Sequence, residues 1–75
     1  MEFHDINFQI KSLIGKKVYI YIQSRIKLEG ILCGFDQFMN LSVKNLRLFN
    51  KKKKKKIGTS LVRGHLVISI EASES

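Results

Sequence analysis

The sequence predicts an all-β domain, in which a short N-terminal helix precedes five antiparallel strands that form a small, strongly bent barrel. Apolar and polar residues alternate with a period of two from Val18 onward, as a half-buried strand requires. Gly30 and Gly34 interrupt a long apolar run, where glycine is typical of a bulge or a sharp bend. Five such short runs favour an SH3-like or OB-like barrel over a sandwich.

The size of the chain limits how it can be stabilised. Its 75 residues form one domain, and a domain this small buries only about 60% of the surface of its unfolded chain. The single cysteine, Cys33, excludes an internal disulfide, and two distant histidines make no metal site. No apolar run approaches the roughly 20 residues of a transmembrane helix, and no signal peptide is recognisable. We therefore expect an intracellular protein without cofactor or metal, stabilised by oligomerisation.

The first residues show helical spacing. One apolar face follows the i, i+3, i+4 pattern and consists of Phe3, Ile6, Ile10, Leu13 and Ile14. Asp5 is suited to the start of a helix, and Gly15 is suited to its end. The pattern therefore predicts a helix over about residues 5–13.

After Gly15 the period changes to two. The first strand covers about residues 17–23, and a longer second strand covers residues 26–35. Only Ser24 and Arg25 are available as turn residues between them, and a positive φ is unfavourable for either side chain.

Asp36 begins the next turn, because its carboxylate can accept hydrogen bonds from the backbone that follows. The third strand begins with Met39, Leu41 and Val43 in core alternation. The apolar phase then slips, which predicts a bulge near Lys44 and Asn45. Two further strands are expected at residues 57–62 and 66–70.

Six consecutive lysines dominate the charge of the chain. The net charge is +8, and the run that supplies six of these charges consists of Lys51, Lys52, Lys53, Lys54, Lys55 and Lys56. Adjacent lysines repel one another and cannot be buried, so we expect a solvated loop over residues 50–56. A solvated loop without further function, a contact to nucleic-acid phosphates and a nuclear address all fit this run.

The last two strands lack the charges, prolines and bulges that normally protect the edge of a sheet. An open roll of five strands leaves two edges free, so we infer that at least one of these strands pairs with another chain. The expected subunit interface consists of Ile57, Leu61, Val62, Leu66, Val67 and Ile68. The alternative is that both strands close on the barrel itself.

Two stretches of the chain resemble the motifs of the Sm and Sm-like RNA-binding family. Gly30–Leu41 (GILCGFDQFMNL) resembles the first Sm motif. Leu61–Val67 (LVRGHLV) resembles the second motif, in which an apolar residue precedes Arg-Gly. The resemblance extends over nearly the whole chain and implies one Sm domain over residues 1–75. The first motif region then covers about residues 16–45 and the second about residues 57–71.

The resemblance implies an RNA site formed by Asp36, Phe38, Asn40, Arg63 and Gly64. An exposed Phe38 ring gives a base a flat apolar face on which to stack. The Asn40 amide has a donor and an acceptor for a uracil edge, and Asp36 can orient it. Arg63 can stack on the base or bind phosphate, and Gly64 permits a tight turn.

Two positions depart from the family pattern. The turn at Ser24 and Arg25 lacks the glycine pair that is common in the family. His65 follows the Arg-Gly pair where members often carry a small polar residue, and we expect it to cap the strand rather than to contact RNA.

The resemblance also implies an assembly. In the eukaryotic Sm ring, seven different subunits pair the fourth strand of one with the fifth strand of the next. They surround a uridine-rich segment of small nuclear RNA at the core of spliceosomal particles. The implied partners are Sm E-like, Sm F-like and Sm D-type subunits, and the implied location is the nucleus after cytoplasmic assembly. The implied process is pre-mRNA splicing.

Other functions remain as alternatives. No group of residues brackets a nucleophile or pairs two carboxylates, so we expect a protein that is not an enzyme. A peptide-binding SH3-like module would need an aromatic groove, and the chain has no tryptophan. The two remaining alternatives are an Sm-like ring subunit that acts in RNA decay and a homo-oligomeric ring that chaperones RNA.

Overall fold

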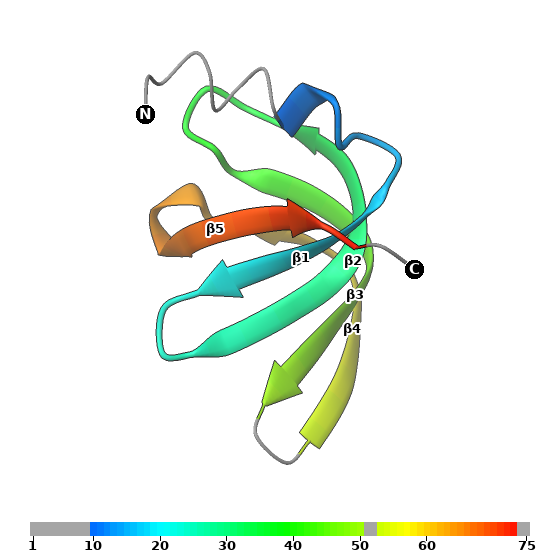
Figure 1. The fold of residues 1–75 in the computed structure, drawn as a ribbon, viewed down its shortest axis with the longest axis vertical. Coiled ribbons are helices and arrows are strands. Elements are labelled where there is room, and N and C mark those ends of the chain that lie inside the picture. Colours follow the sequence, from blue (N-terminus) through cyan, green and yellow to red (C-terminus); the bar gives the residue numbers. More distant parts are fainter. Residues whose placement is uncertain (1–9, 51–52, 74–75) are drawn as a thin grey trace.

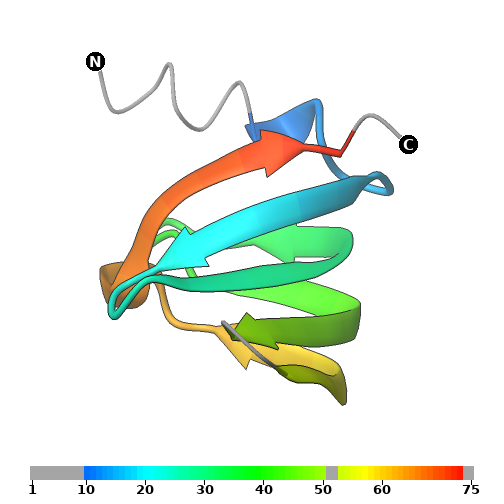
Figure 2. The same ribbon diagram turned by 60° about the horizontal axis from the view of Figure 1, so that its bottom comes forward.

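The computed structural model describes residues 10–50 and 53–73, which form one antiparallel sheet of five strands (Figure 1). The strands are β1 (Lys17–Ile22), β2 (Ile26–Phe35), β3 (Leu41–Asn50), β4 (Lys53–Val62) and β5 (Val67–Ala72). Their order in the sheet is β4-β3-β2-β1-β5, and a short 3-10 helix, η1 (Gly64–Leu66), connects β4 to β5. The sheet bends strongly, so that its two edges curve toward the same side (Figure 2). The all-β class is therefore confirmed.

Most of the helix expected over residues 5–13 lies outside the described residues. Ile10 and Lys11 are helical, and residues 12–15 form turns. This segment is tied to the sheet, because the Gly15 N–H donates to the Leu32 carbonyl at 2.7 Å. No helix in the described part of the chain is long and apolar enough to cross a membrane.

The core lies on the concave face of the sheet and follows the alternation read from the sequence. Its buried members are Ile10, Val18, Ile20, Leu28, Leu32, Leu41, Val43, Leu46 and Val62. Val62 is one of the residues expected at a subunit interface, and in the single chain its side chain packs inward. It pairs with Leu41 across the β3–β4 ladder and is only 6% exposed. Its place in a subunit interface stays a prediction.

Bulges bend the long strands. The register between β2 and β3 shifts on both sides of Ile31, near the two strand glycines. A Cβ at Gly30 would lie 2.4 Å from Val43 Cγ1, so glycine lets the two strands approach closely. The predicted bulge near Lys44 is confirmed, because the β3–β4 register shifts between Val43 and Leu46 and Asn45 has φ 54°.

The lysine run is mainly a strand. β4 begins at Lys53, and its fourth residue, Lys56, pairs with Arg47 of β3. The loop predicted over residues 50–56 is therefore wrong for residues 53–56, while residues 51–52 lie outside the described part. The β3–β4 hairpin projects beyond the rest of the sheet (Figure 1), and Lys55 and Lys56 are exposed. Strand pairing there satisfies the backbone and leaves these two ammonium groups in solvent.

The β1–β2 turn carries the strain that its sequence predicts. Ser24 has φ 71° and Arg25 has φ 58°, and both values lie in the left-handed region that glycine and asparagine tolerate best. Each such residue costs on the order of 1 kcal/mol. The missing glycine pair therefore lowers the stability of this hairpin.

The double variant Ser24→Asn/Arg25→Gly should raise the free energy of unfolding by about 1 kcal/mol, because it relieves this strain. For a domain of this size, that corresponds to a rise in Tm of about 4–8 °C. Gln23→Gly is the matched control, since Gln23 lies in the same turn without a positive φ. Glycine there should lower the Tm in a thermal scan, and a Tm that falls for the double variant would contradict the strain argument.

Candidate nucleic-acid interface

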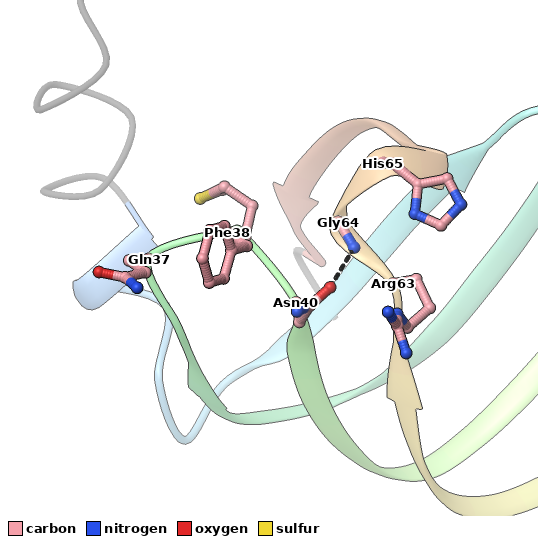
Figure 3. A pocket seen from close by; sticks show the side chains of 7 residues that line it. Gln37, Phe38, Asn40, Arg63, Gly64 and His65 are labelled. Carbon is pink, nitrogen blue, oxygen red and sulfur yellow. Dashed lines mark hydrogen bonds between the residues drawn. The ribbon is translucent and has the colours of Figure 1, made fainter.

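Two connections of the sheet meet at one end of the barrel. The turn over residues 36–40 joins β2 to β3, and residues 63–66 join β4 to β5. They line an open hollow of about 550 Å³, which is large enough for a nucleobase (Figure 3). Its walls consist of Gln37, Phe38, Met39, Asn40, Arg63, Gly64 and His65.

Asp36 organises the first connection. Its Oδ1 accepts hydrogen bonds from the backbone N–H groups of Phe38 at 2.9 Å and Asn40 at 3.0 Å. Its Oδ2 accepts a third bond from Asn40 Nδ2 at 3.0 Å. The Asp36 carbonyl also accepts from the Met39 N–H at 3.0 Å, which closes the turn. The role predicted for Asp36 within the turn is therefore confirmed.

These hydrogen bonds change the acidity of the carboxylate. The side-chain amide of Asn40 is the largest cause that lowers the pKa of Asp36 from its ordinary value of 3.8. The backbone N–H groups of Asn40 and Phe38 and the positive charge of Arg63 lower this pKa further, and desolvation opposes them. The ionised carboxylate is thus the form that the folded turn favours.

Because the pKa of Asp36 is lower in the folded chain, its ionised form adds stability above the unfolded pKa. That stability is lost as the pH falls from about 4 through the lower folded pKa. An Asp36→Asn variant cannot titrate there, so its free energy of unfolding should fall less between pH 5 and pH 2. Denaturant titrations at several pH values test this, and parallel pH profiles for the two proteins would contradict it.

Met39 turns the chain so that Phe38 points outward. Met39 has φ 64°, an unfavourable value for a long side chain. Its side chain packs against the core as predicted, although β3 begins only at Leu41. Phe38 remains 71% exposed. The hydrogen bonds to Asp36 offset the strain at Met39 and hold an apolar ring in solvent, which core packing would not require.

Asn40 and Gly64 join the two connections. The Gly64 N–H donates to Asn40 Oδ1 at 2.7 Å, as the dashed line in Figure 3 marks. The backbones approach so closely that a Cβ on Gly64 would lie 2.0 Å from the Phe38 carbonyl oxygen. Glycine is therefore required here by the close approach of backbone atoms and not by the turn conformation, because Gly64 has no positive φ.

The amide of Asn40 is fixed in orientation and still has hydrogen-bonding capacity. Its nitrogen faces the Asp36 carboxylate, which can only accept, and its oxygen faces the Gly64 N–H, which can only donate. These partners settle which way the amide points. An amide has two N–H donors and two oxygen lone pairs, and these two contacts use one of each.

Arg63 and His65 complete the hollow on the second connection. Both side chains are exposed, and in Figure 3 Arg63 and Phe38 lie on opposite sides of Asn40. His65 had been expected as a strand cap, but it lies within η1 and lines the hollow. Sequence analysis did not assign Gln37 or His65 to the site. Gln37 precedes Phe38 and His65 follows Gly64 in the sequence, and this adjacency could have identified both residues.

The other predicted site residues lie away from this hollow. The described lysines of β4 lie at the end of the strand opposite to Arg63. On the sheet edges, Ile57, Leu61 and Ile68 are 45%, 55% and 67% exposed. Leu66 and Val67 are half-buried.

Two further observations concern the described residues as a whole. β4 and β5 are the outer strands of the sheet, as the sequence predicts for its two unprotected runs. Within residues 10–50 and 53–73, no group of three or more His, Cys, Asp or Glu side chains could hold a metal ion.

Comparison with known proteins agrees with the fold and the motifs. The LSM domain profile matches residues 9–72. The chain is 38% identical over 65 residues to "Probable small nuclear ribonucleoprotein G" of Medicago sativa, which covers 87% of this chain and 80% of that one. It is 34% identical over 64 residues to "LSM complex subunit lsm6" of Schizosaccharomyces pombe, with 84% and 85% covered.

Solved structures show the same architecture. The crystal structure of the P. aerophilum SmAP1 heptamer superposes with a TM-score of 0.87 at 28% sequence identity. The alignment covers 93% of this chain and 95% of that one. The bent sheet, the two motifs that meet at one hollow and the profile match over residues 9–72 show that this chain belongs to the LSM domain family of Sm and Sm-like proteins.

Proposed function

We propose that this chain is an RNA-binding subunit of an Sm ring and that its hollow holds one uridine of a single-stranded RNA. The observation that carries the proposal is the Asn40 amide, which both connections fix in one orientation beside an exposed Phe38 ring. A site that is fixed before its ligand arrives loses little conformational entropy on binding.

Each wall of the hollow has a physical role in this proposal. The Phe38 ring stacks on one face of the base, which is worth about 1–3 kcal/mol. The guanidinium of Arg63 is planar, so it can stack on the opposite face or bind the adjoining phosphate. The unused N–H and lone pair of Asn40 meet the base edge.

Preference for uridine follows from the fixed amide. Uracil and cytosine differ at the base edge, because uracil presents N3–H and a carbonyl where cytosine presents a bare nitrogen and an amino group. A freely rotating amide could adapt to either base by exchanging its oxygen and nitrogen. The contacts from Asp36 and Gly64 prevent that exchange, so Asn40 offers one fixed pattern.

In this proposal the ring is assembled through the two outer strands of each subunit. β4 and β5 present unpaired backbone groups, and their exposed aliphatic side chains would be covered by strand addition from a neighbouring subunit. The similarity to small nuclear ribonucleoprotein G supports a spliceosomal ring with Sm E-like, Sm F-like and Sm D-type neighbours around a uridine-rich small nuclear RNA. The proposed process is pre-mRNA splicing and the proposed location is the nucleus, after assembly in the cytoplasm.

The second candidate is a subunit of an Sm-like ring that acts in RNA decay, which the similarity to "LSM complex subunit lsm6" favours. The two candidates differ in their neighbours and not in the hollow. Native mass spectrometry of the full chain, alone and mixed with Sm-type or Sm-like subunits, separates them. The first candidate predicts hetero-oligomers with Sm E-like and Sm F-like chains.

The hollow is tested by two variants in the assembled ring. Phe38→Ala should weaken binding of oligo-uridine by about 1–3 kcal/mol, because it removes the stacking face. Asn40→Ala should narrow the difference in affinity between oligo-uridine and oligo-cytidine, because it removes the contact to the base edge.

Gln23→Ala is the matched control for both variants. Gln23 is an exposed residue of the turn between β1 and β2, and it does not line the hollow. Its variant should bind both oligonucleotides as the wild type does. Unchanged affinity and unchanged base preference for both Phe38→Ala and Asn40→Ala would refute the proposed site.

A further inference from the structure

The outer face of the sheet is a second surface that the hollow does not use. The ladder aligns Tyr21, Lys27 and Phe49 in one row across β1, β2 and β3. The adjacent row holds Tyr19, Glu29, Arg47 and Lys56 on successive strands, β1 to β4. These positions alternate with the buried core positions, so they face away from the core. Lys44 pairs with Ile31 and follows the buried Val43, so it faces the same way as these rows. We define the outer basic face as Lys27, Lys44, Arg47 and Lys56.

The acidic groups on this face are already engaged. Glu29 is only 9% exposed, and its Oε1 lies 3.6 Å from Lys17 Nζ. Glu71 accepts a hydrogen bond from the Tyr21 hydroxyl at 3.0 Å. By formal charge, the four cations of the outer basic face exceed these two carboxylates by two.

The cations of this face are held without carboxylate partners. Lys27 Nζ lies 4.0 Å from the centre of the Tyr19 ring, and this cation–π contact fixes its position while keeping its full charge. Among the residues that the structure describes, Lys44, Arg47 and Lys56 form no ion pair. The face thus presents net positive charge to solvent.

Arg47 and Lys56 are the least expected cross-strand pair of this face. They are directly opposite one another in the β3–β4 ladder, where like charges destabilise the pairing. Both side chains are exposed, and the register places Arg47 between Lys56 on β4 and Glu29 on β2. An anion that binds to both cations would offset the repulsion between Arg47 and Lys56.

We propose that the outer basic face binds the phosphate backbone of single-stranded RNA, as a contact separate from the base in the hollow. The choice of ligand rests on the proposed function and on the aromatic rings of the same rows. Tyr19, Tyr21 and Phe49 are half-buried beside the cations, and rings among cations are typical of sheets that bind single strands. An acidic peptide could pair with the cations but would have no base to stack.

The two contacts lie in different parts of the sheet. The hollow adjoins Leu41 at the start of β3, whereas Arg47 lies six residues further along that strand. At about 3.3 Å per residue, this separation is on the order of 20 Å. A short oligonucleotide that fills the hollow would not reach the outer basic face, but a longer one would.

Strand alternation supplies a matched pair of variants for the test. Lys56 pairs with Arg47 on the outer face, while its neighbour Lys55 pairs with Leu48, which packs on the core side. Both lysines are exposed, so each serine variant removes one charge from the same strand. Binding of a uridine dinucleotide and of oligo-uridine of about 16 nucleotides to the full chain is measured at several salt concentrations.

With the longer oligonucleotide, Lys56→Ser should lower the slope of log affinity against log salt by about 0.7. Counted from 1 M salt, where the salt-dependent part of the affinity is zero, a slope lower by about 0.7 corresponds to an affinity about fivefold lower at 0.1 M salt. Adding Arg47→Ser should lower the slope by about 0.7 again. Lys55→Ser should leave the slope unchanged, and none of these variants should alter binding of the short oligonucleotide.

Three results would overturn the inference. Equal effects of Lys55→Ser and Lys56→Ser would show a diffuse charge effect and not a face. An unchanged slope for Arg47→Ser/Lys56→Ser, in a protein whose circular dichroism matches the wild type, would show that the face does not contact RNA. Poly-glutamate that binds the wild type and loses affinity in that double variant, while RNA binding does not, would identify an acidic peptide as the ligand.

A further variant, Phe38→Ala, distinguishes failure of the outer basic face from failure of the proposed hollow. Phe38→Ala should weaken binding of both oligonucleotides while leaving the salt slope as in the wild type, because stacking involves no counterion release. If Phe38→Ala has no effect but Lys56→Ser lowers the slope, the hollow is refuted and the outer basic face is retained. If Phe38→Ala weakens binding but Lys56→Ser leaves the slope unchanged, the outer basic face is refuted and the hollow is retained.

Discussion

A Gly64→Ala variant should lose stability and RNA binding together, because the added methyl group collides with backbone atoms. Its Cβ would lie 2.0 Å from the Phe38 carbonyl oxygen and 2.8 Å from the Met39 carbonyl carbon. Neither atom can move without shifting the turn over residues 36–40, so the two connections must separate. Overpacking of this kind costs about 1–3 kcal/mol.

Separation of the two connections also breaks the hydrogen bond from the Gly64 N–H to Asn40 Oδ1, which is 2.7 Å long in the intact site. The amide then no longer has a fixed orientation. We therefore expect affinity for oligo-uridine to fall by more than about tenfold. The measurements are denaturant unfolding and oligonucleotide titration of the same preparation.

Gly34→Ala is the matched control for this variant. Nothing lies within 4 Å of a Cβ built at Gly34, and its φ is outside the left-handed region. Alanine at Gly34 should therefore leave both stability and RNA affinity close to those of the wild type. Wild-type stability for Gly64→Ala would show that the close approach of the two connections is not structurally important.

An Ile68→Asp variant should fold as a single chain and fail to assemble. Ile68 is 67% exposed on the outer strand β5, so a carboxylate there remains in water in the isolated chain. In a ring formed by strand addition, the same carboxylate would be buried without a partner, at a cost of about 3–5 kcal/mol. The association constant should fall by about two to three and a half orders of magnitude, roughly tenfold for each 1.4 kcal/mol.

The site of this substitution matters. Val67 is half-buried against the chain's own core, so a charge there would unfold the chain as well as block assembly. Gln23→Asp is the control, because it adds the same charge in the exposed turn between β1 and β2. Light scattering after size exclusion should show a smaller species for Ile68→Asp and the wild-type assembly for Gln23→Asp. An unchanged assembly for Ile68→Asp would exclude β5 from the interface.

Local sequence patterns were sufficient to predict most of the sheet. The period of two, the glycines of β2 and the phase slip near Lys44 each have a direct structural counterpart, because burial and close backbone approach act on the nearest neighbours in sequence. The turn at Asp36 was also predictable, since its hydrogen bonds all lie within four residues.

Features that depend on pairing between distant strands were not predictable. Charge repulsion indicated a loop for the lysine run, but pairing with β3 makes residues 53–56 part of a strand. Val62 reads as an edge residue, yet its partner Leu41 places it in the core. The cross-strand pair of Arg47 and Lys56 likewise exists only because of the register.

In the candidate site, too, the local features were predictable from the sequence and the long-range features were not. Its residue types were readable from two short motifs, whereas the bond that unites them spans 24 residues of sequence, from Asn40 to Gly64. The participation of His65 in the hollow follows from η1, whose position depends on where β4 ends and β5 begins. Sequence spacing alone does not give that geometry.

Photo-crosslinking with oligo-uridine that carries 4-thiouridine tests the central claim most directly. The wild-type chain, in the assembly that it forms in solution, is irradiated with the oligonucleotide, and the adducts are mapped by peptide mass spectrometry. A base stacked on an exposed Phe38 ring should give its main adduct within the turn over residues 36–40. The Gly64→Ala variant should lose that adduct, and Gly34→Ala should retain it. Adducts confined to the outer face of the sheet, with none in this turn, would contradict the account.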